Sequence, residues 1–189
     1  MKKGAIHHRR SIRLQGFDYT KEGAYYITIC TSDKRLLFGT VNRESVLLNQ
    51  LGQLAEQCWL EIPDHSPTVT IDYYVVMPNH FHGILVITEP PTDTNLLLPS
   101  HSVEAQDPAP CAVEVRVPRV IPRSLGAIVR GYKSAITRLA HGLPGFETTL
   151  IWQRNYYEHV IRDEDDLYVK RNYIQNNPLQ WESDEFYCK

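Results

Sequence analysis

The sequence has few of the features that would assign it to a specialised class of protein. No apolar run approaches the roughly 20 residues that a membrane-spanning helix needs. The four cysteines are scattered without a CxxC pair, which argues against a zinc ribbon or a disulfide framework. The N-terminal stretch MKKGAIHHRRSIRL is basic but lacks the apolar core of a signal peptide. We therefore expect a cytoplasmic protein with free thiols and no membrane partner.

The chain also lacks a net charge large enough to identify a partner. Its formal charge is −2 over 189 residues, and 22% of its side chains are charged, values ordinary for one globular domain. The cations are unevenly placed, because residues 1–14 and 116–138 contain Lys and Arg but no Asp or Glu. Local basic stripes are typical of a phosphate-facing surface, although a solvated helix face gives the same pattern.

Periodicity and turn residues predict an α+β fold. Four segments are aromatic, β-branched or apolar and are strand-like: 24–32, 68–77, 80–87 and 150–161. A further strand after residue 32 is expected to form a hairpin with the first. Three residues are suited to cap helices that end near residues 61, 141 and 176: Asn49, Ser124 and Asp163. This order of elements favours a ferredoxin- or RRM-like antiparallel sheet with helices packed mainly on one face.

Two segments do not fit this pattern. Residues 1–22 are predicted to form a basic N-terminal arm. Residues 89–122 contain seven prolines and little periodicity, so we interpret them as a long mobile insertion rather than a second domain. The chain is thus predicted to be a single domain over residues 1–189.

Two histidines interrupt the apolar segment HFHGILVI. Because the side chains of a strand alternate between its faces, His80 and His82 share one face, about 7 Å apart, while Phe81 points to the other. Neutral imidazoles on a rigid strand can bind a divalent cation when another element supplies a further ligand. Two histidines that form hydrogen bonds beside the core would explain the same pattern.

Three motifs, in order along the chain, carry a resemblance to a known family. VVMPNHFHGILVI resembles the His-hydrophobic-His motif of HUH single-strand nucleases. RRSIRLQGFDYTKEGAYYITICT and WQRNYYEHVIRDEDDLYVKRNYIQNNPLQW resemble the N-terminal and C-terminal segments of one branch of these proteins. That branch is the REP-associated tyrosine transposases, which belong to the single-tyrosine transposases. The resemblance covers most of the chain outside the proline-rich insertion.

The resemblance implies a metal-dependent endonuclease and strand transferase that acts on single-stranded DNA at hairpins from repetitive palindromes. His80 and His82 would hold a divalent metal, Mg²⁺ or Mn²⁺, at the scissile phosphate. A tyrosine on a helix would attack and form a 5′-phosphotyrosine link that conserves the phosphoester energy. The metal matters because a phenol, with a pKa of about 10, is a poor nucleophile at neutral pH. Relatives with this fold include monomers and dimers, so a homodimer stays open.

The predicted nucleophile is Tyr132, which lies in the predicted helix 125–141. Three cations of that helix surround it in the sequence, namely Arg130, Lys133 and Arg138. Cations near a phenol favour the phenolate and also bind flanking phosphates. An ordinary position on an amphipathic helix would account for Tyr132 equally simply.

The sequence departs from the family pattern in this helix. Many relatives have a tyrosine where this chain has Ile136, one helical turn after Tyr132. Either Tyr132 acts in a shifted register, or the protein is a domesticated relative that binds hairpin DNA without cutting it. His141 is the predicted third metal ligand, because it lies next to the place where relatives would have a polar ligand.

The remaining predicted site residues would contact DNA: Arg9, Arg10, Arg13, Arg130, Lys133, Arg138, Arg154 and Tyr156. Tyr156 and its neighbour Tyr157 could stack on unpaired bases, although aromatic side chains of strands also pack within sheets. An unrelated hydrolytic metalloenzyme is a weaker alternative, since no carboxylate lies between Asp72 and Glu89.

Overall fold

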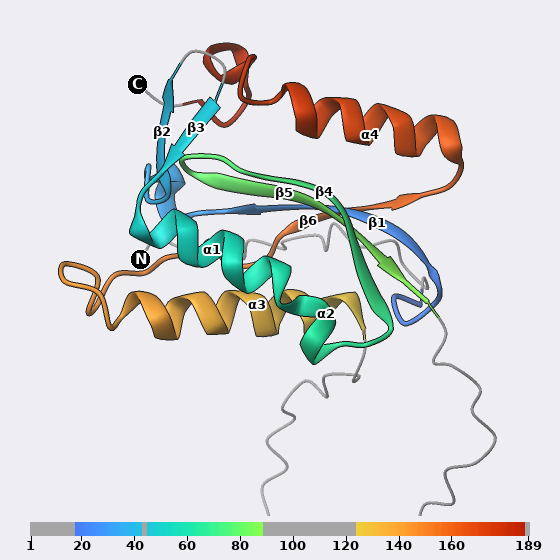
Figure 1. Ribbon diagram of the computed structural model, residues 1–189, viewed down its shortest axis with the longest axis horizontal. Helices are drawn as coiled ribbons and strands as arrows, with labels where there is room; N and C mark the ends of the chain where they lie inside the picture. The colour runs from blue at the N-terminus through green and yellow to red at the C-terminus, as the bar shows by residue number, and fades with distance from the viewer. Residues whose placement is uncertain (1–17, 43–44, 89–123, 188–189) are drawn as a thin grey trace, which may run out of the picture.

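The computed structural model describes residues 18–42, 45–88 and 124–187, and within them an antiparallel sheet is the central element (Figure 1). Its strand order is β4-β5-β1-β6. The strands are β1 (Gly23–Cys30), β4 (Val69–Val76), β5 (His80–Ile87) and β6 (Tyr157–Ile161). A separate two-stranded hairpin consists of β2 (Gly39–Asn42) and β3 (Ser45–Leu48). The predicted pairing of residues 68–77 with 80–87 is confirmed, since β4 pairs with β5.

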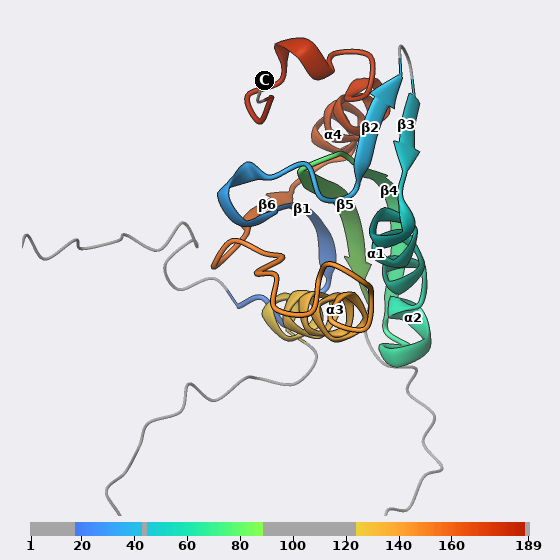
Figure 2. The same cartoon turned by 90° about the vertical axis from the view of Figure 1, so that its left-hand side faces the viewer.

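Helices cover both faces of the sheet, unequally. Figure 2 shows α1 (Gln50–Leu60), α2 (Ile62–His65) and α3 (Leu125–Ala140) on one side, and α4 (Glu164–Asn176) on the other. Short 3-10 turns are η1 (Ser32–Lys34) and η2 (Trp181–Ser183). Each predicted cap is confirmed, because the side chains of Asn49, Ser124 and Asp163 accept hydrogen bonds from backbone N–H groups in the first turn of α1, α3 and α4. The predicted α+β architecture is therefore confirmed.

The main core lies between the sheet and the three helices α1, α2 and α3. Alternate residues of β1 and β5 point into it, among them Ile27 and Phe81. Gly83 allows α1 to approach β5 closely, because a Cβ atom there would lie 2.5 Å from Cζ2 of Trp59. A smaller cluster on the α4 side contains Tyr26, Ile84 and Ile174.

Two details of the predicted strands are wrong. β1 does not form a hairpin with the following strand, since its two edges are taken by β5 and β6. Asp33 and Lys34 both have φ 55°, and this left-handed turn leads the chain out of the sheet before β2. The predicted strand 150–161 is regular only from Tyr157 onward, because Asn155 has φ 80°.

The predicted arm and insertion fall largely outside the described residues. Only residues 18–22 of the arm are described, and the whole of 89–122 lies beyond the described ranges. Within 18–42, 45–88 and 124–187, no helix has both the length and the hydropathy that a bilayer crossing requires.

Candidate active site

The histidine pair lies on β5 and faces α4. His80 and His82 are 0% and 1% exposed, and their ring centroids are 4.5 Å apart. Neither Nε2 atom has a hydrogen-bond partner among the described residues. Burial lowers the pKa of His80 to about 4, against the attraction of the Asp184 carboxylate, and burial also holds the pKa of His82 well below its usual value. Both imidazoles are therefore neutral at pH 7 and able to donate a lone pair.

Asn79 fixes the tautomer of His80. Its side-chain nitrogen donates to the carbonyl oxygens of Lys34 at 3.2 Å and Phe186 at 2.8 Å, so its oxygen faces the histidine. The distance from this oxygen to Nδ1 of His80 is 2.8 Å. Because an amide oxygen only accepts, Nδ1 of His80 carries the proton and Nε2 carries the free lone pair.

Two hydroxyl groups orient His82 in a similar way. Nδ1 of His82 lies 2.8 Å from the hydroxyl oxygen of Tyr26 and 2.9 Å from that of Thr28. The Thr28 hydroxyl donates to the Tyr26 oxygen at 3.2 Å, which leaves a lone pair on Thr28 to accept the Nδ1 proton. These contacts hold Nδ1 of His82 in place, and Nε2 has no hydrogen-bond partner among the described residues.

Asp184, directly after η2, completes a cluster with the histidines. One ligand atom from each of His80, His82 and Asp184 lies within 4.8 Å of the others. The Asp184 carboxylate accepts 2.7 Å hydrogen bonds from Nδ2 of Asn177 and from the backbone N–H of Phe186, which hold it in place. Two neutral imidazoles with free lone pairs and one carboxylate are a donor set that fits a divalent metal.

His141 does not belong to this cluster. It follows the last residue of α3, is exposed, and has its Nε2 atom 3.3 Å from the carbonyl oxygen of Thr149. His82 contacts Tyr173 of α4, and α4 and α3 cover opposite faces of the sheet (Figure 2), so the structure does not bring His141 and the histidine pair together. Among the described residues, Asp184 rather than His141 lies beside the histidine pair.

Tyr132 is placed in the main core, away from the histidine pair. It is 3% exposed, and its hydroxyl donates to the carbonyl oxygen of Ala55 at 3.1 Å. Its ring contacts three aromatic side chains: Trp59, Phe81 and Trp152. Burial raises its pKa well above the ordinary value. The structure therefore does not bring Tyr132 and the histidine pair together.

A different tyrosine, Tyr173 on α4, lies beside the pair. Its ring is 5.2 Å from the ring of His82 in an edge-to-face arrangement, and its hydroxyl donates to Oδ2 of Asp184 at 3.4 Å. Burial, followed by the charge of Asp184, raises the pKa of Tyr173 to about 12. The sequence signal was the spacing in YIQNN, since Tyr173 and Asn177 are four residues apart and share one helix face.

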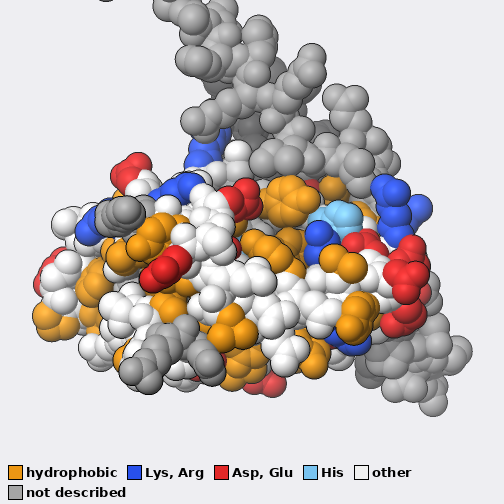
Figure 3. Space-filling view, turned by 90° about the horizontal axis from the view of Figure 1, so that it is seen from above, with side chains coloured by type: hydrophobic (Ala, Val, Ile, Leu, Met, Phe, Trp, Pro, Cys, Tyr) orange, Lys and Arg blue, Asp and Glu red, His pale blue; other side chains and the backbone are white. Residues whose placement is uncertain are grey.

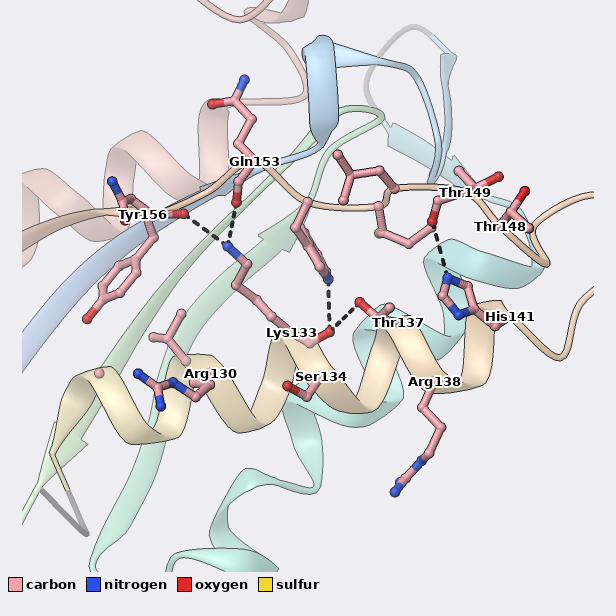
Figure 4. Close-up of a pocket in the computed structure, with 16 residues that line it drawn as sticks. Arg130, Lys133, Ser134, Thr137, Arg138, His141, Thr148, Thr149, Gln153 and Tyr156 are labelled. Atoms are coloured by element: carbon pink, nitrogen blue, oxygen red, sulfur yellow. Dashed lines mark hydrogen bonds between the residues drawn. The ribbon is translucent and has the colours of Figure 1, made fainter. Parts of the chain in front are cut away.

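The predicted DNA-contacting residues of α3 and the segment after it lie around a different pocket, on the opposite side of the sheet (Figure 4). It has a volume of about 850 Å³, and no Asp or Glu is among the described residues that line it. Figure 4 shows Arg130, Lys133, Arg138 and His141 projecting from α3, with Lys133 donating to the carbonyl oxygens of Gln153 and Asn155. The other predicted contacts are half-buried Tyr156 at the pocket, exposed Arg154, and Arg9, Arg10 and Arg13 outside the described residues.

The side that carries α4 has a different character. Figure 3, which views the molecule from that side, shows hydrophobic side chains interspersed with acids and cations, and no uniformly basic surface. Such a surface offers aromatic contacts and single charges, which suit unpaired bases better than a duplex backbone.

Comparison with known proteins identifies relatives of the whole chain. No family model matches it. It is 43% identical over 182 residues to an uncharacterised protein of Haemophilus influenzae, covering 96% of this chain and 94% of that protein. It is 23% identical over 163 residues to an H. influenzae protein assigned to the REP-associated tyrosine transposases, covering 86% of this chain and 74% of the relative.

A solved structure shares the fold. A REP-associated tyrosine transposase bound to a REP hairpin superimposes with a TM-score of 0.53 and 23% identity, covering 89% of this chain and 73% of that one. The sequence relationship, the shared fold and the histidine pair on a central strand agree with the three sequence motifs. The chain is therefore similar over most of its length, in sequence and in fold, to REP-associated tyrosine transposases.

Proposed function

We propose that this protein is a divalent-metal-dependent endonuclease and strand transferase for single-stranded DNA at hairpins, with Tyr173 as its nucleophile. One observation carries the proposal: the Tyr173 hydroxyl, the free Nε2 atoms of His80 and His82, and the Asp184 carboxylate lie together on the α4 side of the sheet. Tyr173 is 36% exposed, so a DNA strand can approach it from solvent.

His80, His82 and Asp184 are the residues that would hold Mg²⁺ or Mn²⁺. The side-chain oxygen of Asn177, which is buried and has no hydrogen-bond partner among the described residues, is a candidate fourth ligand. When bound, the ion would withdraw charge from a non-bridging oxygen of the scissile phosphate and make the phosphorus a better electrophile.

The chain supplies the nucleophile and its base. Because the pKa of Tyr173 is raised to about 12, its hydroxyl is protonated at neutral pH and needs an acceptor for its proton. Asp184 already accepts a hydrogen bond from that hydroxyl, so it takes the proton as the Tyr173 oxygen attacks phosphorus. The bond from phosphorus to the 3′-oxygen breaks, and that oxygen leaves as a 3′-hydroxyl with a proton from water. The product is a 5′-phosphotyrosine link to Tyr173.

Hairpin DNA is the proposed partner. The relative of known structure is bound to a REP hairpin. In this chain, we assign phosphate contacts to Arg130, Lys133 and Arg138, since the pocket that they line beside α3 has no acid among its described lining residues. Arg154, which is exposed, keeps the same proposed role. The arm residues Arg9, Arg10 and Arg13 keep the same proposed role. The proposed ligands and Tyr173 all come from one chain, so a monomer or a homodimer in the cytoplasm is compatible with this site.

A covalent-adduct assay tests the proposal. A labelled hairpin oligonucleotide with single-stranded flanks, incubated with Mn²⁺, should give an adduct that survives denaturing electrophoresis. Tyr173→Phe and His82→Ala should abolish the adduct, and chelation of the metal should do the same. Tyr132→Phe is the matched control, because it removes a tyrosine hydroxyl on the other side of the sheet.

The alternative function is hairpin binding without cleavage. Ile136, which replaces the tyrosine of many relatives, favoured this alternative at the level of the sequence. In the structure Ile136 is a fully buried core residue, so it does not bear on a nucleophile in α4. Salt-dependent binding of the hairpin by the wild type, with no adduct under any metal, would favour this alternative over the enzyme.

A further inference from the structure

A second pocket lies directly beside the proposed active site. It has a volume of about 550 Å³ and is lined by side chains of the sheet, of α4 and of the segment after η2. The sheet contributes Tyr26 and Tyr157, α4 contributes Lys170 and Tyr173, and Phe186 lies on the remaining side. This volume is that of a small-ligand site, too small for a DNA duplex but sufficient for one nucleotide.

We propose that this pocket binds the unpaired nucleotide next to the phosphate that Tyr173 attacks, with the base stacked on Tyr157. The inference rests on the proposed function and adds to it a base-binding site. We refer to the pocket as the nucleotide pocket.

The aromatic composition of the nucleotide pocket supports a base as its occupant. The ring of Tyr26 is 6.3 Å from the ring of Tyr157 and 6.3 Å from that of Tyr173, so the three rings form one continuous aromatic surface. Tyr26 is 4% exposed and forms the floor, whereas Tyr157 is 43% exposed and presents its ring to solvent. Exposed aromatic rings bind unpaired bases by stacking, with little dependence on base identity.

The charges of the nucleotide pocket also match a single nucleotide. Lys170 is the one cation among its described lining residues, and its Nζ atom is held 5.0 Å from the centre of the Tyr26 ring. One cation is suited to one phosphate rather than to a duplex backbone. Glu185 supplies carboxylate oxygens, which accept hydrogen bonds from the amino groups of bases.

The strand register places Tyr157 within reach of the proposed metal centre. Thr28 of β1 pairs with His82 on one side and with Tyr157 on the other. These three residues form one row across the sheet, and two strand spacings separate His82 from Tyr157 by about 10 Å. A base attached to a phosphate at the histidines can therefore reach the Tyr157 ring.

The neighbouring tyrosine does not share this position. Tyr156 precedes β6, is half-buried, and packs against the main core on the opposite face. Of the two tyrosines for which the sequence predicted stacking, we therefore assign the role to Tyr157.

Photocrosslinking tests the nucleotide pocket without depending on catalysis. The protein carries Tyr173→Phe, and the probe is a hairpin oligonucleotide with 5-iododeoxyuridine at each single-stranded flanking position in turn. Irradiation should crosslink one probe position to Tyr157, as mapped by mass spectrometry. Crosslinks that map only outside the nucleotide pocket would overturn the inference.

Affinity measurements give a second, independent readout. Hairpins with and without a single-stranded flank are compared, and Tyr157→Ala should lower the affinity for the flanked hairpin about 10- to 100-fold while leaving the flankless one unchanged. Tyr157→Phe should retain the affinity. Tyr168→Ala is the matched control, since Tyr168 is 66% exposed on α4 and does not line the pocket. An unchanged affinity of folded Tyr157→Ala for the flanked hairpin would refute the stacking.

The outcomes separate this inference from the proposed function. A Tyr157 crosslink in a protein whose wild type forms no adduct would retain the pocket and reject the nuclease. An adduct at Tyr173 without any crosslink in the nucleotide pocket would retain the nuclease and reject the pocket.

Discussion

Arg171 of α4 donates two hydrogen bonds to the carboxylate of Asp72 on β4, one of them from Nε to Oδ1 at 2.9 Å. The same guanidinium lies 5.5 Å from the centre of the Tyr73 ring. Only Ile174 is fully buried in α4, so apolar packing contributes little to holding this helix on the sheet. Among the described residues, the Arg171–Asp72 ion pair and a 2.7 Å hydrogen bond between Nε2 of His159 and Oδ2 of Asp166 connect α4 to the sheet.

We predict that Asp72→Asn loosens the helix that carries Tyr173. A partly exposed ion pair is worth about 1 kcal/mol, so the melting temperature should fall by about 2–4 °C. The rate of adduct formation should fall further than stability alone explains, because Tyr173 is no longer held at the histidines. Calorimetry and adduct kinetics on the same preparation measure both effects. Asp64→Asn on α2 is the control, and equal adduct rates in the two variants would argue against the anchoring role.

A second prediction concerns Tyr132→Phe. Removing the hydroxyl leaves the carbonyl of Ala55 without this donor in the core, which should lower the free energy of unfolding by about 1 kcal/mol. Adduct formation should persist, since Tyr132 lies on the other side of the sheet. Urea denaturation and the adduct assay measure the two effects. A variant of normal stability that forms no adduct would restore Tyr132 as the nucleophile.

The buried histidines predict a loss of stability in mild acid. The unfolded chain takes up protons on histidine near pH 6.5, whereas folded His80 has a pKa of about 4 and burial also holds the pKa of folded His82 well below its usual value. Because the unfolded state binds more protons between these values, stability is complete above about pH 6.5 and falls as the pH drops toward 4. The slope should reach about 1.4 kcal/mol per pH unit for each histidine.

Denaturant titrations in the presence of a chelator, at pH 7.5, 6 and 5, measure this slope. His80→Gln and His82→Gln should each reduce it, since glutamine does not titrate. A slope that is the same in the wild type and in both variants would assign the acid sensitivity to other groups.

Asn79 should control metal affinity through the tautomer of His80. In Asn79→Ala the acceptor for the Nδ1 proton is lost, and Mn²⁺ should bind about 10- to 100-fold more weakly. Asn79→Asp keeps an acceptor at this position and should retain most of the affinity. Isothermal titration calorimetry measures both variants, with His141→Ala as a control that should bind as the wild type does. Tight binding by folded Asn79→Ala would contradict the positioning role.

The sequence predicted the features that depend on local pattern. The β4–β5 hairpin, the caps at Asn49 and Ser124, and the shared face of His80 and His82 all follow from turn residues and strand alternation. These features need no knowledge of how distant elements pack.

The proposed nucleophile, Tyr173, and the proposed third ligand, Asp184, depend on long-range packing instead. Tyr132 and Tyr173 each lie on a helix, and the sequence does not say which helix covers the histidine face. α3 has the stronger apolar stripe, and that stripe buries Tyr132 in the core. Asp184 reaches the histidines only because the chain turns back after α4, and periodicity carries no signal for such a loop.

The alternation along β5 has a consequence for how this protein tolerates change. His80 and His82 face the proposed metal site, while Phe81 and Leu85 face the core, so the two faces of one strand serve the proposed function and stability in alternate residues. A substitution in one set therefore affects the side chains on only one face of the sheet. A single-residue deletion within β5 would exchange the two sets, bringing imidazoles into the core and phenylalanine to the phosphate. β5 should therefore tolerate many substitutions but no insertion or deletion that shifts its register by one residue.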